Sequence, residues 1–231
     1  MLTKKQEKLI RSLSTVKGRQ ESGLCLVEGR KNIEMAGRHI LYTFTDKDTK
    51  NFKSLVTTKT PQNIAGVAKI PEWRIEDIVK FSLVVLLDGV QDPGNVGAIF
   101  RLCLGFGASA VLVESADPAS PKVIRSSAGT MFHVPYIKIN RRRAEEFLQD
   151  LNRKIYRLEK TEGSLICNFD TMKAISKDKI VLIAGSEGSG IMLDVKGESI
   201  SIPHSPKLES LNVSVALGIF MNFYYLYRQS C

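Results

Sequence analysis

Six apolar runs dominate the pattern of hydrophobic and polar positions from Phe81 onward. They cover residues 81–87, 110–114, 134–139, 154–159, 179–185 and 199–203. Stretches with helical spacing separate most of these runs, and continuous apolar strands that alternate with helices are typical of a mainly parallel sheet with helices on both faces. We therefore expect residues 81–231 to form one α/β domain.

The first 72 residues have shorter apolar runs and predict a small α/β module. Apolar positions among lysines at 3–13 predict a short basic helix, which is followed by a loop over 17–23 and a second helix over 30–36. Short strands are expected at residues 24–29, 41–45, 54–58 and 64–70. Pro and charged residues after the last of these strands predict a linker over residues 73–80.

Basic charge is concentrated in the same small module. The 231 residues hold 33 Lys and Arg against 24 Asp and Glu, which gives a formal net charge of +9. Residues 1–80 hold 16 basic and 9 acidic side chains, so most of the excess lies there. A basic excess attracts polyanions and makes nucleic acid the first partner to consider, whereas the alternative is that the charge only keeps the protein soluble.

Cysteine usage and the first residues favour a cytoplasmic protein. Cys25, Cys103, Cys167 and Cys231 are widely spaced, form no CxxC motif and are not accompanied by a His cluster, so neither a disulfide framework nor a zinc site is expected. Residues 1–13 are charged throughout and lack the apolar stretch of a secretory signal. The uncharged segment 210–227 is interrupted by Ser and Asn, which predicts a buried or subunit-contacting helix instead of a membrane span.

The loops that follow the predicted strands are the places to look for a ligand, because open parallel sheets bind ligands beyond the carboxyl ends of their strands. In the first such loop, Pro93 and Gly94 predict a tight turn and Asn95 is a candidate cap of the next helix. Arg101 follows within two helical turns. The alternative is an ordinary strand-to-helix turn with a capping Asn and a solvated Arg.

Two further loops carry candidate functional groups. The segment GSEGSG (185–190) is rich in glycine but matches neither GxGxxG nor GxxxxGK[ST], and Glu187 within it would repel a phosphate. This carboxylate favours a cationic or hydroxyl-bearing ligand, although a glutamate in a turn is common without any function. Ser210 and Asn212 precede a long apolar helix whose first free N–H groups would face a ligand; the alternative is that Ser210 only caps that helix.

Three segments, taken in order, resemble the three motifs of the SpoU (TrmH-type) RNA ribose 2′-O-methyltransferases of the SPOUT superfamily. They are NVGAIFR (95–101), GSEGSG (185–190) and IPHSPKLESLNVSVA (202–216). LCLVEGRKNIEMA (24–36) and TPQNIAGVA (60–68) resemble the start and the end of the small substrate-binding domain that often precedes the methyltransferase domain. His204 departs from the pattern, because the family frequently has Met at that place.

The resemblance implies a particular architecture and a cofactor. It implies an α/β methyltransferase domain with a C-terminal trefoil knot, preceded by a small α/β (L30e-like) domain at residues 1–72. It also implies a homodimer that uses the helix from Leu211, and S-adenosylmethionine (AdoMet) as the cofactor. The residues that the resemblance assigns to the cofactor are Ile183, Ala184, Gly185, Ser186, Glu187, Gly188, Ile202, Leu211 and Asn212.

By the same resemblance, the catalytic residues are Asn95, Arg101, Glu187, Ser210 and Asn212. Methyl transfer from a sulfonium to a ribose hydroxyl requires that both substrates are positioned and that the hydroxyl proton is removed. Arg101 resembles the residue proposed as the base in the family. Because a guanidinium normally stays protonated, Arg101 would alternatively clamp the adjacent phosphate.

The expected substrate is structured RNA, with rRNA preferred over tRNA, and neither a metal nor a membrane is expected as a partner. The small basic module should contact the RNA through Lys4, Lys5, Lys8, Arg11, Lys17, Arg19, Arg30 and Lys31. The main alternative is a non-catalytic RNA-binding or ribosome-assembly factor of the same fold. A nucleotide-binding oxidoreductase is a weaker alternative, because no dinucleotide fingerprint lies between a strand and a helix.

Overall fold

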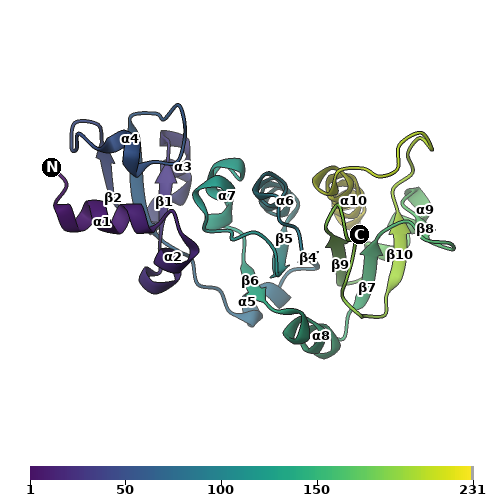
Figure 1. Ribbon diagram of the computed structural model, residues 1–231. Coiled ribbons are helices and arrows are strands. Elements are labelled where there is room, and N and C mark those ends of the chain that lie inside the picture. Colours follow the sequence, from purple (N-terminus) through teal and green to yellow (C-terminus); the bar gives the residue numbers. More distant parts are fainter. Residues whose placement is uncertain (230–231) are drawn as a thin grey trace. The chain divides into compact units, whose positions relative to one another are not determined.

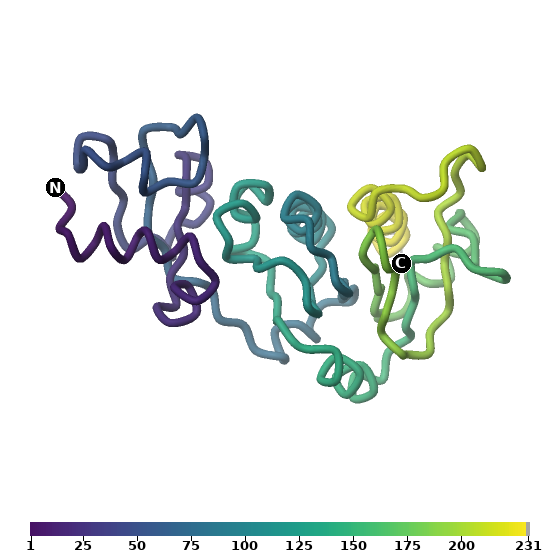
Figure 2. The backbone as a smooth tube through the Cα atoms, viewed as in Figure 1, coloured from purple at the N-terminus to yellow at the C-terminus, as the bar shows by residue number. Residues whose placement is uncertain are grey.

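The computed structural model describes residues 1–229 and divides into two compact units. The N-terminal unit comprises Met1–Glu72 and Asp117–His133, and the C-terminal unit comprises Trp73–Ala116 and the residues from Val134 onward. Figures 1 and 2 show the course of the chain through both units. No helix within residues 1–229 has the length and apolar character needed to cross a lipid bilayer.

The N-terminal unit packs helices around an antiparallel sheet of order β1-β3-β2. Its elements are α1 (Lys4–Ser12), α2 (Val16–Ser22), β1 (Leu24–Glu28), α3 (Arg30–Ala36), a 3-10 turn η1 (Gly37–His39), β2 (Ile40–Thr45), α4 (Phe52–Leu55), β3 (Ile64–Lys69), α7 (Pro121–Ser126) and a second 3-10 turn η2 (Thr130–Phe132). Its core joins Ile10 and Leu13 of the first helical segment to Leu26, Phe44 and Val67 of the strands.

Two elements of this unit differ from the sequence prediction. Residues 17–23 were expected to be a loop but lie mainly in α2. The helix begins where the Thr15 side chain accepts a hydrogen bond from the Gly18 N–H, and it ends at Gly23, which has a φ of 66°. The expected strand over 54–58 is also wrong. Phe52 and Leu55 are three positions apart and both are buried, so one helical turn places them on the same side.

The segment 117–133 is joined to the N-terminal unit by buried charged contacts, although it lies within the range predicted for the second domain. The guanidinium of Arg19, which is 2% exposed, donates to the Asp117 carboxylate at 2.6 and 2.8 Å. Arg125 of α7 lies 3.0 Å from the Glu28 carboxylate at the end of β1. Burial by itself would raise the pKa of Glu28, but the hydroxyl and amide donors of Thr57, the Thr58 hydroxyl and Arg125 outweigh it and lower that pKa.

The C-terminal unit is built on a seven-stranded parallel sheet of order β6-β5-β4-β9-β7-β10-β8. Its elements are α5 (Ile75–Val79), β4 (Leu83–Asp88), α6 (Pro93–Phe106), β5 (Ala108–Val113), β6 (Tyr136–Ile139), α8 (Arg141–Asp150), β7 (Lys154–Leu158), β8 (Leu165–Ile166), α9 (Phe169–Ile175), β9 (Ile180–Gly185), β10 (Glu198–Ser201) and α10 (Val213–Gln229). The prediction of an α/β fold with a large parallel sheet and helices is confirmed.

Helices pack against the sheet, and residues 75–79 of the predicted linker form one of these helices. Ile78 of α5 is buried against Val84 and Leu86 of β4, together with Phe147 and Leu148 of α8. Residues 75–79 are therefore a helix of the C-terminal unit. Helices α6 and α10 pack against each other and bring the first and third sequence motifs together.

Candidate functional site

The strands β4, β9, β7 and β10 lie next to one another in the parallel sheet, so their carboxyl ends share one edge. They end at Asp88, Gly185, Leu158 and Ser201. The first motif lies in α6, which follows β4, the second in the loop that begins at the end of β9, and the third in the loop after β10 and the start of α10. All three lie in the C-terminal unit. The edge of the sheet thus gathers segments that are far apart in the sequence, as expected for a ligand site in such a fold.

Asn95 lies in the first turn of α6 and does not cap it, which corrects the sequence prediction. The cap is Asp92, whose Oδ1 accepts a hydrogen bond from the Asn95 N–H at 2.8 Å. Because Asp92 takes the capping role, the Asn95 side chain is available for other partners. Arg101 follows on the same helix and is exposed, and no hydrogen bond or ion pair joins its side chain to another residue within 1–229.

The glycine-rich loop after β9 closes on itself and presents Glu187. Ser186 and Gly190 exchange backbone hydrogen bonds of 3.2 and 3.0 Å. A Cβ on Gly185 would lie 2.1 Å from the carbonyl carbon and oxygen of Gly190, so this close approach requires glycine. Glu187 is exposed within the turn.

Asn212 has two roles at the start of α10. Its Oδ1 accepts hydrogen bonds from the Ser214 N–H at 3.0 Å and from the Ser214 hydroxyl at 2.6 Å, so Asn212, and not Ser210, caps the helix. Its Nδ2 donates in the opposite direction, to Asn95 Oδ1 at 2.9 Å and to Glu187 Oε1 at 2.8 Å.

These contacts form a polar cluster of Asn95, Glu187 and Asn212, one residue from each motif. Asn95 Nδ2 completes it by donating to Glu187 Oε1 at 3.0 Å. Both amide groups therefore converge on one carboxylate oxygen and leave Oε2 without a bond inside the cluster. The structure brings together three of the five predicted catalytic side chains, whereas Ser210 and Arg101 lie outside this set of hydrogen bonds.

Two adjoining cavities lie beside the cluster and share five lining residues: Leu158, Glu159, Ser210, Leu211 and Ala216. The first cavity, of about 200 Å³, is lined also by Ala184, Gly185, Ser186 and Glu187. The second, of about 120 Å³, is lined also by Ile200, Ile202 and His204. Six of the nine predicted cofactor residues thus line one or both cavities.

The other three predicted cofactor residues lie elsewhere. Ile183 is fully buried in the core of the sheet with Val84 and Val181, and it lines neither cavity. Gly188 is exposed in the glycine-rich loop, and Asn212 belongs to the polar cluster. The apolar character of Ile183 comes from its central strand and needs no ligand to explain it.

Two acidic residues at this edge were missed by the sequence analysis. Asp88, at the end of β4, is 1% exposed and accepts hydrogen bonds from the backbone N–H groups of Met192 and Leu193, while Arg141 donates to it at 3.2 Å. Asp88 therefore holds the chain that leaves the glycine-rich loop. Glu159 directly follows β7 and lines both cavities. The signal available for both was an acidic residue at the end of an apolar run.

His204 lines the second cavity and has one ring nitrogen bonded. Its Nδ1 lies 2.7 Å from the carbonyl oxygen of Ile202, so Nδ1 is the protonated nitrogen in the neutral ring. Its Nε2 is buried and has no hydrogen-bond partner among residues 1–229.

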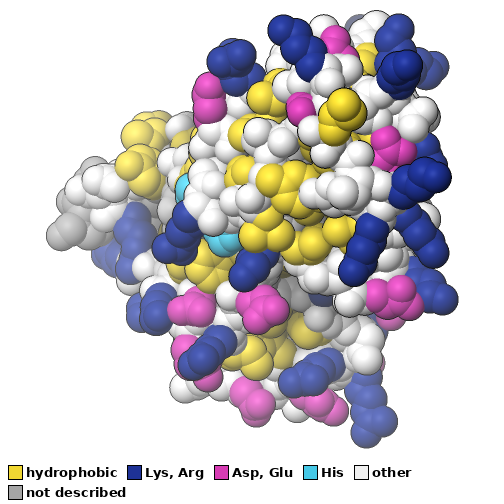
Figure 3. Space-filling model, turned by 90° about the vertical axis from the view of Figure 1, so that its left-hand side faces the viewer, with side chains coloured by type: hydrophobic (Ala, Val, Ile, Leu, Met, Phe, Trp, Pro, Cys, Tyr) yellow, Lys and Arg dark blue, Asp and Glu magenta, His cyan; other side chains and the backbone are white. Residues whose placement is uncertain are grey.

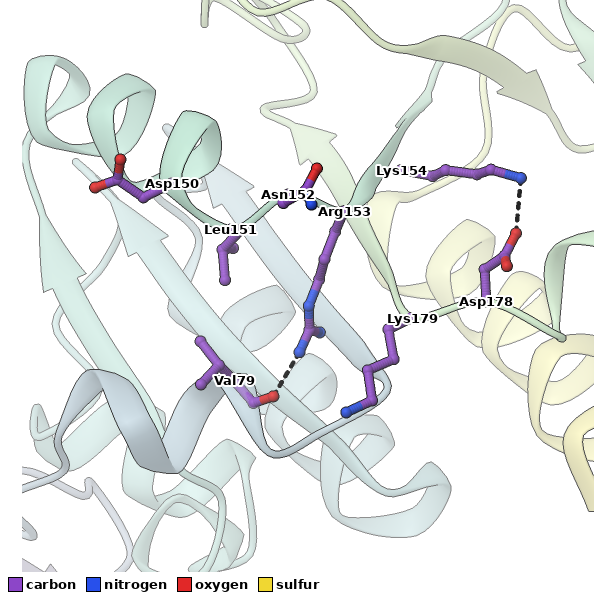
Figure 4. Close-up of a pocket in the computed structure, with 8 residues that line it drawn as sticks. All are labelled: Val79, Asp150, Leu151, Asn152, Arg153, Lys154, Asp178 and Lys179. Carbon is purple, nitrogen blue, oxygen red and sulfur yellow. Dashed lines mark hydrogen bonds and ion pairs between the residues drawn. The ribbon is translucent and has the colours of Figure 1, made fainter.

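A further cavity of the C-terminal unit, about 610 Å³, lies at the opposite edge of the sheet (Figure 4). It is lined by residues near the amino ends of β7 and β9, including Arg153, Lys154 and Lys179. Arg153 points to the backbone of Val79, and Lys154 pairs with Asp178 at 2.7 Å (Figure 4). Arg153, Lys154 and Asp178 are thus engaged in structural contacts, and the residues that line this cavity include none of the three motifs.

Seven of the eight predicted RNA-binding side chains are exposed on the N-terminal unit, and one is not. The exposed ones are Lys4, Lys5, Lys8, Arg11, Lys17, Arg30 and Lys31. Arg19 is buried with Asp117 and the Leu13 carbonyl, so the prediction that it contacts RNA is wrong. On the face drawn in Figure 3, Lys and Arg side chains surround an exposed apolar area.

The comparisons with known proteins agree with the motifs and the fold. The family model for the SpoU rRNA Methylase family matches residues 82–222. The chain is 32% identical over 176 residues to 23S rRNA (guanosine(2553)-2′-O)-methyltransferase RlmP of Bacillus subtilis, covering 74% of this chain and 67% of the relative. It is 38% identical over 174 residues to 23S rRNA (adenosine(1067)-2′-O)-methyltransferase of Streptomyces laurentii, covering 72% of this chain and 63% of the relative.

The fold has a counterpart among solved structures. The crystal structure of AdoMet-bound rRNA methyltransferase from Sinorhizobium meliloti superposes with a TM-score of 0.81 at 24% identity, covering 97% of this chain and 95% of the other. Together, the fold, the three motifs and the polar cluster define this protein as an RNA methyltransferase with a parallel α/β domain. The chain belongs to the SpoU rRNA methylase family, and the family predicted from the three motifs is confirmed.

Proposed function

We propose that this protein transfers a methyl group from AdoMet to a ribose 2′-hydroxyl of structured RNA, with rRNA as the substrate class. The observation that carries the proposal is the cluster of Asn95, Glu187 and Asn212 beside the two cavities, in a chain of the SpoU family. The named relatives methylate 23S rRNA at ribose, which favours rRNA over tRNA.

The chemistry of the two cavities fits AdoMet. Ile200, Ile202 and Ala216 offer apolar surface for a purine ring in one cavity, and the loop from Ala184 to Glu187 lines the other. Glu159 and Glu187 are acceptors and anions, which suit a sulfonium, an ammonium or hydroxyl groups. His204 Nε2, which has no partner in the described part of the chain, adds an acceptor that a ligand donor would satisfy.

When bound, AdoMet supplies the electrophilic methyl group, and the side chains of this protein position the hydroxyl that attacks it. Asn212 and Asn95 hold the Glu187 carboxylate, so its orientation is set before any ligand arrives. The Arg101 side chain is exposed and has no hydrogen-bond or ion-pair partner within residues 1–229, which leaves its guanidinium for the RNA. In the proposal it either clamps the phosphate next to the reacting ribose or takes part in removal of the hydroxyl proton.

The proposal includes an RNA-contacting surface, a homodimer and a trefoil knot. The exposed cations of the N-terminal unit support the first. Large apolar side chains left exposed on α6, α9 and α10 support the second: Leu104, Phe169, Val215 and Leu226 are 41%, 70%, 51% and 52% exposed. The trefoil knot is supported by the position of β10 between β7 and β8, because the chain that leaves β9 returns to the sheet between two strands that come earlier in the sequence.

The test is transfer of a labelled methyl group from AdoMet to rRNA transcribed without modifications, measured for the wild type and Arg101→Ala. The wild type should incorporate label, and Arg101→Ala should lose it by on the order of 100-fold or more while its dissociation constant for AdoMet stays within about twofold. Incorporation at the wild-type rate by Arg101→Ala would remove Arg101 from the reaction. AdoMet binding by the wild type without any transfer would favour the non-catalytic alternative.

A further inference from the structure

Glu159 is the acidic side chain at the junction of the two cavities. It directly follows β7, whose neighbours in the sheet are β9 and β10, and it lines both cavities. One cavity ends at Glu187 and the glycine-rich loop, and the other at Ile202 and His204. A ligand that fills both cavities must therefore pass Glu159.

The Glu159 carboxylate is held in place by neighbours on β7 and β10. Arg157 Nε and the Ser199 hydroxyl both donate to its Oε1 at 2.8 Å. Arg157 is itself fixed by hydrogen bonds to the carbonyl oxygens of Leu193 and Val195. Within residues 1–229 the second oxygen, Oε2, has only a 3.5 Å contact with Arg157 Nη2, so it keeps acceptor capacity for a ligand.

Glu159 is also an anion in the folded protein. Burial alone would raise its pKa, but the hydrogen bonds from Arg157 and Ser199 and the charge of Arg157 outweigh that effect and lower the pKa. An ionised carboxylate only accepts hydrogen bonds, so its partner in a ligand must be a donor. With its side chain 25% exposed, Glu159 can reach a ligand without unfolding the loop.

We propose that Glu159 accepts hydrogen bonds from the ribose hydroxyls of AdoMet, a role that rests on the proposed function. AdoMet has a purine at one end, an amino acid at the other and a ribose between them. The apolar residues of one cavity suit the purine, the loop with Glu187 suits the charged amino-acid part, and Glu159 lies where the two cavities meet. An acidic residue after a parallel strand binds the ribose hydroxyl in dinucleotide folds by the same chemistry.

Binding, measured by titration calorimetry on the full chain, tests this role separately from catalysis. Glu159→Gln should weaken AdoMet and S-adenosylhomocysteine equally, by on the order of tenfold or more, because a charged acceptor is lost and both ligands carry the ribose. The control is Glu198→Gln, an exposed carboxylate at the other end of β10, which should bind both ligands as the wild type does. Ser199→Ala, which removes one bond that holds Glu159, should weaken both ligands less than Glu159→Gln.

A modified ligand completes the test. The 2′-deoxy form of S-adenosylhomocysteine should bind the wild type weakly and should lose little further affinity in Glu159→Gln. Weakening of AdoMet alone would instead assign Glu159 to the sulfonium charge and overturn the ribose role, as would an unchanged affinity in Glu159→Gln. A wild type that binds neither AdoMet nor S-adenosylhomocysteine would contradict the proposed function itself.

Discussion

Asn212 shows how one side chain joins a structural role to a site. Its oxygen caps α10 through Ser214, and its amide nitrogen holds Asn95 and Glu187. The cap fixes the rotamer of the side chain, so the nitrogen can point only toward the cluster. Stability and function can be separated here, because a carboxylate can replace the capping oxygen but cannot replace the donor.

Asn212→Asp should therefore keep the fold and lose activity. The new carboxylate would cap α10 but would lie against Glu187 at the place where a donor stood 2.8 Å away. We expect methyl transfer to fall by on the order of tenfold or more, with a melting temperature near that of the wild type. Asn212→Ala, which loses both roles, should in addition lower the free energy of unfolding by about 1 kcal/mol. A fully active Asn212→Asp would show that the cluster is not needed for the reaction.

The motif sequences predict which residues belong to the site better than they predict the hydrogen bonds that these residues make. Asn95, Glu187 and Asn212 were expected to act together and do meet. That Asp92 caps α6 in place of Asn95 depends on local rotamers, which composition does not show. The burial of Arg19 depends on Asp117, 98 positions away. A prediction from the basic charge of the segment alone therefore places Arg19 at the surface.

Among the elements at the site, the loop after β9 has a strict steric requirement. Its turn closes through Ser186 and Gly190 and places Glu187 at the cluster. Gly185 allows this closure, because any side chain there would overlap Gly190. Around Gly188, three positions on, no described residue other than its chain neighbours comes within 4 Å of where its Cβ would lie, so it provides a matched comparison.

Gly185→Ala should lower the free energy of unfolding by about 1–3 kcal/mol, the cost of overpacking, and should abolish AdoMet binding because the loop opens. Gly188→Ala should change the free energy of unfolding by less than about 0.5 kcal/mol. Denaturant unfolding of both variants measures the difference. Equal stability of the two would show that the loop relaxes around a methyl group and does not depend on glycine at 185.

Element type was most predictable where the chain is buried on both sides. Runs such as 81–87 and 179–185 are continuous because their strands occupy the middle of a parallel sheet covered by helices. The short helices α2 and α4 escaped prediction, since helices of seven and four residues offer too little periodicity to distinguish them from a loop or a strand. Strand β8 has two residues, which is too short for a periodic pattern to predict it.

For the whole molecule, the uneven charge predicts where RNA affinity originates. Three exposed lysines lie in α1: Lys4, Lys5 and Lys8. Each lysine that binds a phosphate releases counterions, so it contributes to both affinity and salt dependence. The cofactor cavities lie in the other unit, and their affinity for AdoMet should not depend on these lysines.

Replacement of Lys4, Lys5 and Lys8 by Gln should weaken rRNA binding and reduce the slope of log K against log salt. The expected reduction is about 0.7–0.9 for each phosphate that a lysine no longer neutralises. AdoMet binding should remain that of the wild type. The control removes the same charge from exposed Lys173, Lys177 and Lys196 of the C-terminal unit, and it should leave the slope almost unchanged. An equal reduction in both variants would mean that net charge, and not the N-terminal unit, governs RNA affinity.

The most direct test of the account is the position of the methyl group in the RNA product. Unmodified rRNA incubated with the wild type and AdoMet would be digested to nucleosides, and mass spectrometry would assign the added methyl to the ribose or to the base. We expect one added methyl on ribose, with the phosphodiester bond on its 3′ side resistant to alkali. A methyl found only on a base, or no methyl at all from a protein that binds AdoMet and rRNA, would contradict it.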